Sequence, residues 1–150
     1  MPTSLMPLFP VFVIVLAGGM AALQAPMNAA LGRSLNSATA AATISFGVGF
    51  LGLLVLSLVL GDGRSFARTT QVDGWLLLGG LLGAFYVWAI LWSIPVLGIV
   101  TAVSAMILGQ LLVALTLDAM GPFGLPVHEV SGTRILAVVL VAGGVILSRM

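Results

Sequence analysis

Long apolar stretches alternate with short polar connections along the 150 residues of this chain. A helix needs about 20 consecutive apolar residues to cross the hydrocarbon core of a bilayer. Five stretches meet or approach that length, and they cover residues 7–31, 38–60, 74–94, 96–117 and 131–149. The pattern predicts an all-α integral membrane protein, with one domain over residues 1–150 and five transmembrane helices.

The connections between these stretches leave no room for a soluble domain, because the longest hydrophilic one runs only from Asp62 to Asp73. Pro95 and Gly98 separate the third stretch from the fourth, so we expect those two helices to be antiparallel neighbours. The fifth stretch is the shortest. We expect either that the bilayer thins locally or that the Arg134 side chain snorkels, so that its guanidinium lies at the membrane–water interface.

Composition supports a membrane location. Hydrophobic residues make up 61% of the chain and charged residues only 6%, whereas soluble domains carry about 25% charged residues. The chain has no cysteine, which excludes disulfides, thiol nucleophiles and thiolate metal sites. Small residues recur four apart in several stretches, for example Gly18 with Ala22, Ala25 with Ala29, and Gly79 with Gly83, which favours close helix packing.

The charged residues say little about orientation. All five basic residues are arginines, too few and too scattered for a nucleic-acid surface. If the chain has five spans, three arginines lie on the same side of the membrane as the N-terminus: Arg64, Arg68 and Arg134. The other two, Arg33 and Arg149, lie on the opposite side. This near balance weakly favours a cytoplasmic N-terminus. It also fits insertion in both orientations as an antiparallel homodimer, or pairing with a paralogue.

Two amides interrupt the first apolar stretch. Gln24 and Asn28 are four residues apart, so a helix places them on one face. Burying an unpaired amide in hydrocarbon costs roughly 2–7 kcal/mol. Both side chains are therefore expected to face a cavity that binds substrate, or else to tie helices together by hydrogen bonds. Pro26, between them, removes a backbone donor and is a candidate hinge.

The other polar or aromatic residues within the stretches complete the candidate site. We expect Ser45, Tyr86, Trp88 and Gln110 to contribute to substrate binding, Tyr86 and Trp88 by stacking. Asp118 borders the fourth stretch closely enough to be a candidate for ion coupling. The alternative is an interfacial ion pair between Asp118 and Arg134.

Catalytic chemistry is not expected. His128 is the sole histidine, so no zinc site of the usual kind can form. No nucleophile has a base and an orienting partner within the stretches, and no phosphate-binding loop is present. We therefore expect no enzyme, no metal and no cofactor.

Several segments together resemble the YdcZ family of small bacterial membrane proteins. They are Gly19–Arg33, Ser45–Gly47, Gly79–Ala84, Pro95–Gly98, Gly109–Leu111, Asp118–Gly124, Arg134 and Gly143–Gly144. The family belongs to the drug/metabolite transporter superfamily, whose ten-helix members duplicate a five-helix unit. The resemblance implies a multi-pass inner-membrane protein that assembles as two inverted copies: a homodimer, a paralogous pair or a fusion.

A fainter likeness is to the small multidrug resistance exporters. Their Tyr-Ala-Val-Trp pattern is similar to Phe85-Tyr86-Val87-Trp88, and their essential glutamate precedes a serine by ten residues, as Gln24 precedes Ser34. The resemblance implies that an uncharged amide replaces the proton-coupling carboxylate here.

These observations lead to one main hypothesis and two alternatives. The main hypothesis is a small-molecule transporter with alternating access, whose chamber lies between helices one to three of two inverted subunits. Its substrate is expected to be neutral, zwitterionic or amphipathic. The alternatives are a non-transporting scaffold or accessory subunit, and a lipid-handling protein whose wholly apolar segment Pro10–Leu16 lines a lateral gate.

Overall fold

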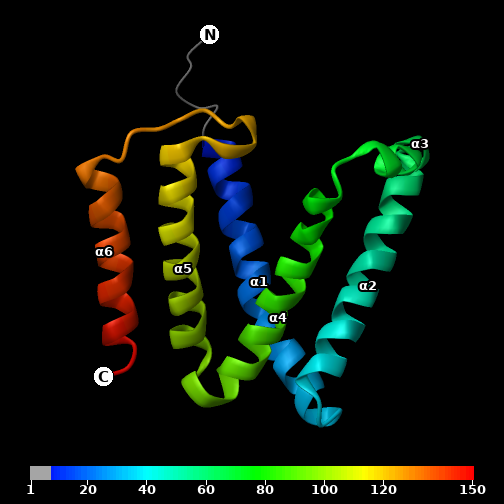
Figure 1. The fold of residues 1–150 in the computed structure, drawn as a ribbon. Coiled ribbons are helices and arrows are strands. Elements are labelled where there is room, and N and C mark those ends of the chain that lie inside the picture. The colour runs from blue at the N-terminus through cyan, green and yellow to red at the C-terminus, as the bar shows by residue number, and fades with distance from the viewer. Residues whose placement is uncertain (1–7) are drawn as a thin grey trace. The chain divides into compact units, whose positions relative to one another are not determined.

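The computed structural model describes residues 8–150, and within that range the chain forms helices and connecting turns without a β-strand (Figure 1). The α-helices are α1 (Leu8–Ser34), α2 (Ala38–Val59), α3 (Gly63–Phe66), α4 (Leu78–Leu97), α5 (Ile99–Met120) and α6 (Gly132–Leu147). Three short 3₁₀ helices are η1 (Ala67–Gln71), η2 (Gly74–Leu77) and η3 (Pro122–Gly124). The chain divides after Pro95 into two compact units.

In the first unit, α1 and α2 are antiparallel and pack against each other through a tight turn (Figure 1). Ser37 begins α2 as its N-cap, because its hydroxyl oxygen accepts the N–H of Ala40 at 3.1 Å. Asn36 precedes it with φ +50°, a conformation that asparagine tolerates better than most residues. This turn fixes where the two helices meet.

The buried residues of the first unit lie in a short section of each helix. They come from the second half of α1, the start of α2 and the second half of α4: Ala25, Asn28, Ala29, Ala41, Ala42, Val87, Ile90, Leu91 and Ile94. Gly32 of α1 lies close to both α2 and α4. A Cβ added there would lie 3.6 Å from Ala38 Cα and 3.7 Å from Leu91 Cδ2. We call this set of buried residues the plug.

Away from the plug the same helices are open. Every residue of α1 from Leu8 to Met20 is exposed, as are most residues in the second half of α2. A Cβ added at several glycines would meet no described atom within 4 Å beyond its chain neighbours and the backbone of its own helix: Gly18, Gly19, Gly47, Gly49, Gly52, Gly79 and Gly80. Of the expected small-residue contacts, the Ala25 and Ala29 pair lies in the plug, whereas these glycines have no neighbour within the described chain.

The second unit is a hairpin of α5 and α6, held at both ends. At one end Arg134 Nη1 donates to Asp118 Oδ2 at 2.9 Å, so the two residues form the ion pair that was the alternative to a coupling role for Asp118. At the other end Thr101 Oγ1 donates to the carbonyl of Ser148 at 3.2 Å. The loop between the helices turns at Gly121, where φ is +59°. An added Cβ there would lie 2.6 Å from Val127 Cγ2 and 2.9 Å from the Leu125 carbonyl oxygen, so the turn requires glycine.

Four segments of the described chain are long and apolar enough to cross a membrane: Leu8–Ser34, Ala38–Val59, Gly74–Leu97 and Ile99–Met120. The fifth expected span, α6, has 16 residues and is shorter than that length. The expected start of the first helix at Pro7 lies outside the described residues. Of the two residues expected to break the chain here, Pro95 lies inside α4, which continues to Leu97, and Gly98, with φ +78°, separates α4 from α5.

Candidate functional site

A cavity of about 480 Å³ lies between α1, α2 and α4 of the first unit. Its lining is mostly apolar and includes three polar side chains, one from each helix: Gln24, Ser45 and Tyr86. The remaining lining residues are Phe46, Gly49, Phe50, Leu53, Gly83 and Val87. We call it the chamber cavity. Three residues selected from the sequence alone thus line one cavity, although up to 62 positions separate them.

The three polar side chains of the chamber cavity make no hydrogen bonds within the described part of the chain. Gln24 is exposed, and Ser45 and Tyr86 are half-buried. None of the three makes a side-chain hydrogen bond to another described residue. An amide, a hydroxyl and a phenol together offer both donors and acceptors. The cavity can therefore hydrogen-bond a polar group of a ligand while its aromatic and aliphatic walls contact an apolar part.

Asn28 lies one helical turn beyond Gln24, in the plug rather than in the lining of the chamber cavity. The residue is 8% exposed, and its side chain makes no hydrogen bond to another described residue. The amide atoms keep some accessible area, since every fully buried side-chain nitrogen or oxygen in the described range has a partner. Asn28 is therefore a nearly buried amide in an otherwise apolar contact between helices.

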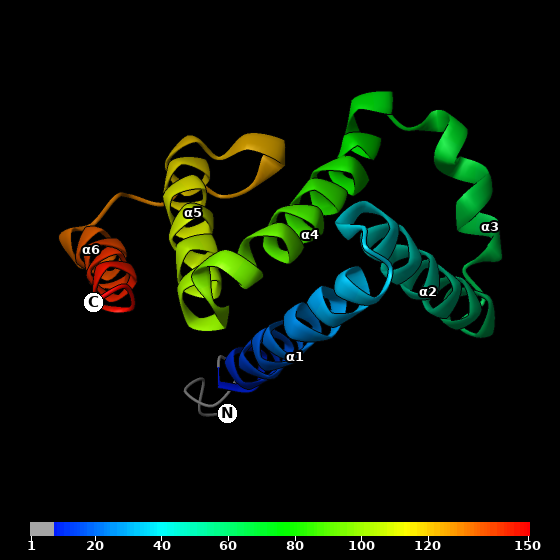
Figure 2. The ribbon, with the colours of Figure 1, turned by 90° about the horizontal axis from the view of Figure 1, so that it is seen from below.

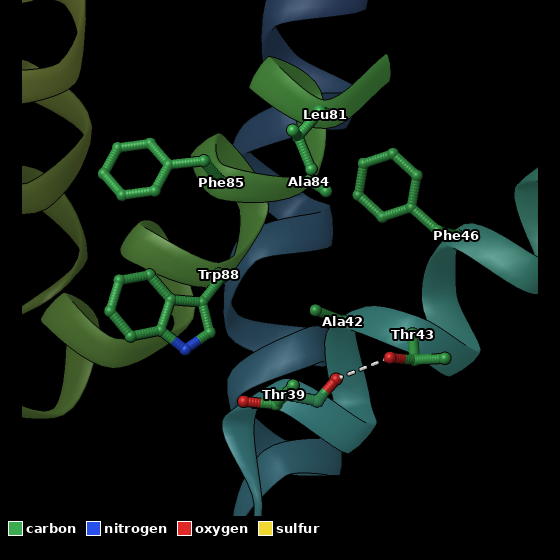
Figure 3. Close-up of a pocket in the computed structure, with 8 residues that line it drawn as sticks. All are labelled: Thr39, Ala42, Thr43, Phe46, Leu81, Ala84, Phe85 and Trp88. Atoms are coloured by element: carbon green, nitrogen blue, oxygen red, sulfur yellow. Dashed lines mark hydrogen bonds between the residues drawn. The ribbon is translucent and has the colours of Figure 1, made fainter. Parts of the chain in front are cut away.

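Trp88 lines a different cavity from Tyr86. The two residues are two apart on α4, which places them about 200° apart around the helix axis. The second cavity, of about 430 Å³, lies between α2 and α4 and is lined by Thr39, Ala42, Thr43, Phe46, Leu81, Ala84, Phe85 and Trp88 (Figure 3). The Phe85 and Trp88 ring centroids are 5.9 Å apart, and both side chains project from the same side of α4. A shared chamber for Tyr86 and Trp88 was expected; the described cavities separate them.

Phe46 lines both cavities and is the main lining residue that was not among the candidates selected from the sequence. Its ring lies 3.7 Å from where a Cβ of Gly83 would be, so α2 approaches α4 at this point. Figure 3 shows the ring directed from α2 toward α4 beside Ala84. The segment Ser45–Gly47 carries part of the family resemblance, but it assigned Phe46 no role in a site, because one phenylalanine among many apolar residues has no distinguishing chemistry.

The remaining candidates lie elsewhere. Gln110 is exposed on α5, and Asp118 is engaged with Arg134 in the second unit. Pro26 lies inside α1, which continues from Leu8 to Ser34. Within residues 8–150 no group of three or more metal-ligating side chains is close enough to hold an ion.

Apolar spanning helices around a mostly apolar cavity with a few free polar groups define a multi-pass membrane protein with a ligand-sized site. A family model described as "Putative inner membrane exporter, YdcZ" matches residues 9–147, and the chain belongs to that YdcZ family. This confirms the resemblance and places the protein in the inner membrane.

Among curated proteins, the chain is similar to "Inner membrane protein YdcZ" of Escherichia coli (strain K12), with 31% identity over 80 residues. The match covers 53% of this chain, and it spans about half (54%) of that relative's own length. No solved structure matches the chain.

Proposed function

We propose that the chain is a small-molecule transporter of the drug/metabolite transporter type, working by alternating access, and that the chamber cavity is its substrate site. The observation that carries the proposal is the convergence of Gln24, Ser45 and Tyr86, from three helices, on one mostly apolar cavity. The exporter description of the family supports the same function.

The plug supplies one closed end for such a chamber. On α1 the cavity residue Gln24 is followed, one turn on, by Asn28 in the plug. Small side chains on α1 and α2 let the helices approach closely there, at Ala25, Ala29, Ala41 and Ala42. In the proposed cycle this contact separates and Asn28 becomes available to the substrate. Pro26 cannot donate a backbone hydrogen bond to residue 22, which lowers the cost of bending α1 near this point.

A second copy of the chain, or a paralogue, completes the chamber in this proposal. The open halves of α1, α2 and α4 carry glycines without neighbours in the described chain, and such surfaces suit helix contacts in a membrane. The near-even distribution of arginines is compatible with an inverted second copy. The proposed unit therefore has five helices per subunit, with α6 as the short fifth.

The chemistry of the chamber cavity indicates a class of substrate. No ionisable residue other than the phenol of Tyr86 lines it, so a strongly charged ligand would enter without a compensating charge. We infer a neutral, zwitterionic or amphipathic substrate, no enzymatic step and no cofactor. If transport is coupled to an ion, the Asp118–Arg134 pair is the candidate, and Gln110 and Trp88 are candidates for secondary contacts.

The test is ligand-dependent thermal stabilisation of purified protein, screened with neutral, zwitterionic and amphipathic compounds. For a compound that stabilises the wild type, Gln24→Ala and Tyr86→Phe should lower its affinity about tenfold, as expected for losing one hydrogen bond in a desolvated site. Gln71→Ala, which removes an exposed amide from η1, is the control and should change nothing. Unchanged affinity in both cavity variants would mean that the chamber cavity is not the substrate site. If these variants instead dissociate from a dimer that the wild type forms, the result would favour the alternative function of a non-transporting scaffold.

A further inference from the structure

A third cavity of the first unit lies at the end of the plug farthest along α1 from Gln24. It has a volume of about 230 Å³ and is lined by Ala29, Gly32, Arg33, Asn36, Ser37, Ala38, Leu91, Trp92 and Pro95. We call it the arginine cavity. Polar side chains of the α1–α2 turn form one part of the lining, and apolar residues of α1, α2 and α4 form the rest. Figures 1 and 2 show this turn at one end of the α1–α2 pair.

The charge of Arg33 is not neutralised by the first unit. Among residues 8–150 the one ion pair joins Arg134 to Asp118, and Arg33 takes no part in it. The two carboxylates of the first unit, Asp62 and Asp73, follow the far end of α2 and precede η2. Because α2 has 22 residues, its ends are about 33 Å apart, well beyond the reach of an ion pair. A guanidinium without a counter-charge in the first unit thus lines the cavity.

The arginine cavity also has the composition of a membrane–water boundary. It lies where three spanning segments end or begin, and Trp92 in its lining is 64% exposed. Tryptophan and arginine are typical of that boundary, where the phosphates of the lipid lie. Arg33 is exposed and can move to meet a ligand, whereas Ala29 and Leu91 are buried and belong to the plug.

We propose that the arginine cavity binds the phosphate of an anionic phospholipid. The Arg33 guanidinium donates two parallel hydrogen bonds to phosphate oxygens. The Ser37 hydroxyl oxygen already accepts from Ala40, but its O–H is free to donate, and the Asn36 amide adds a further donor. The apolar part of the lining contacts the glycerol and the beginning of the acyl chains.

The volume fits this ligand. About 230 Å³ corresponds to the liquid volume of roughly eight water molecules, enough for a phosphate and part of its glycerol but not for whole acyl chains. The chains would lie outside, along the exposed apolar faces of the helices. Because Ala29 and Leu91 belong to both the cavity and the plug, a bound lipid would hold the plug closed. The proposal rests on the membrane location and not on transport.

The experiment measures binding of phosphatidylglycerol to detergent-purified protein by native mass spectrometry. Arg33→Gln should weaken phosphatidylglycerol binding at least tenfold. Arg33→Lys keeps the charge but loses the planar guanidinium group, so its affinity for phosphatidylglycerol should lie between those of Arg33→Gln and the wild type. Arg149→Gln is the matched control, since it removes one arginine that does not line this cavity, and its affinity should stay within twofold. Circular dichroism and gel filtration verify folding.

Three results would overturn the proposal. Equal losses in the Arg33 and Arg149 variants would mean attraction to surface charge alone. Full binding by Arg33→Gln would exclude the guanidinium from the site. Displacement of the lipid by millimolar inorganic phosphate would assign the cavity to free phosphate instead. None of these results depends on whether the chamber cavity binds a substrate, so the two proposals fail separately.

Discussion

Replacing Asn28 by leucine distinguishes an amide kept for function from one that ties helices together. Asparagine and leucine both branch at Cγ into two terminal groups, so the change removes polarity while largely keeping the shape. Asn28 is 8% exposed and makes no hydrogen bond within the described chain, and its neighbours in sequence within the plug are the small residues Ala25 and Ala29. The variant therefore loses no observed contact and gains apolar burial.

The expected gain follows from the cost of the unpaired amide. Removing water from a polar group without a replacement partner costs about 1–3 kcal/mol in proteins. Because the amide atoms keep some accessible area, the lower part of that range applies, and we expect the free energy of unfolding to rise by about 1–2 kcal/mol. At about 2–4 °C per kcal/mol for a chain of this size, the melting temperature should rise by about 2–8 °C.

The assay is thermal unfolding in detergent together with flux into liposomes of a compound that stabilises the wild type. Asn28→Leu should be more stable than the wild type and should transport more slowly, because the plug then opens onto an apolar surface. Asn28→Ala, which leaves a small void, separates the loss of the amide from any overpacking. A lower melting temperature in Asn28→Leu would overturn this prediction, because the amide would then be a structural hydrogen-bonding group.

Further predictions concern the two helix contacts and one turn, each measured as a change in unfolding free energy. Gly32→Ala should be tolerated within about 1 kcal/mol, because its Cβ meets neighbours at ordinary contact distance, whereas Gly32→Leu should cost about 1–3 kcal/mol by overpacking the plug. Gly121→Ala should cost at least 1–2 kcal/mol from its left-handed backbone alone; a neutral result would mean that the turn rearranges freely. Asp118→Asn should cost about 0.2–1 kcal/mol, since the pair with Arg134 is partly exposed, and a loss above 2 kcal/mol would contradict this.

Hydropathy predicted most of the fold because the bilayer requires each spanning segment to be long, apolar and internally hydrogen-bonded. Four segments have that length, and the fifth, α6, does not, which its short apolar stretch already indicated. Pro95 and Gly98 together were expected to break the chain between the third and fourth segments. A proline inside a helix removes one hydrogen bond without ending the helix, and α4 ends only at Leu97, before Gly98 with its positive φ.

The polar part of the candidate site was predictable for the same physical reason. Few polar side chains occur in the spans, so Gln24, Ser45 and Tyr86 stood out, and the ion pair between Asp118 and Arg134 followed from opposite charges flanking one loop. The apolar walls were not predictable, because Phe46 is chemically like the lipid-facing residues around it. Tyr86 and Trp88 line different cavities because residues two apart in sequence point to nearly opposite sides of a helix. Their spacing in the sequence already indicated this separation.

Filling the chamber cavity is the sharpest test of whether it carries substrate. Gly49 lines the cavity, whereas Gly74, in η2, does not, and a Cβ at either position meets nothing within 4 Å. Gly49→Leu and Gly74→Leu should therefore both fold. In liposomes, flux of a compound that stabilises the wild type should fall at least tenfold in Gly49→Leu and stay within twofold in Gly74→Leu. Wild-type flux in a folded Gly49→Leu would mean that the cavity does not carry substrate.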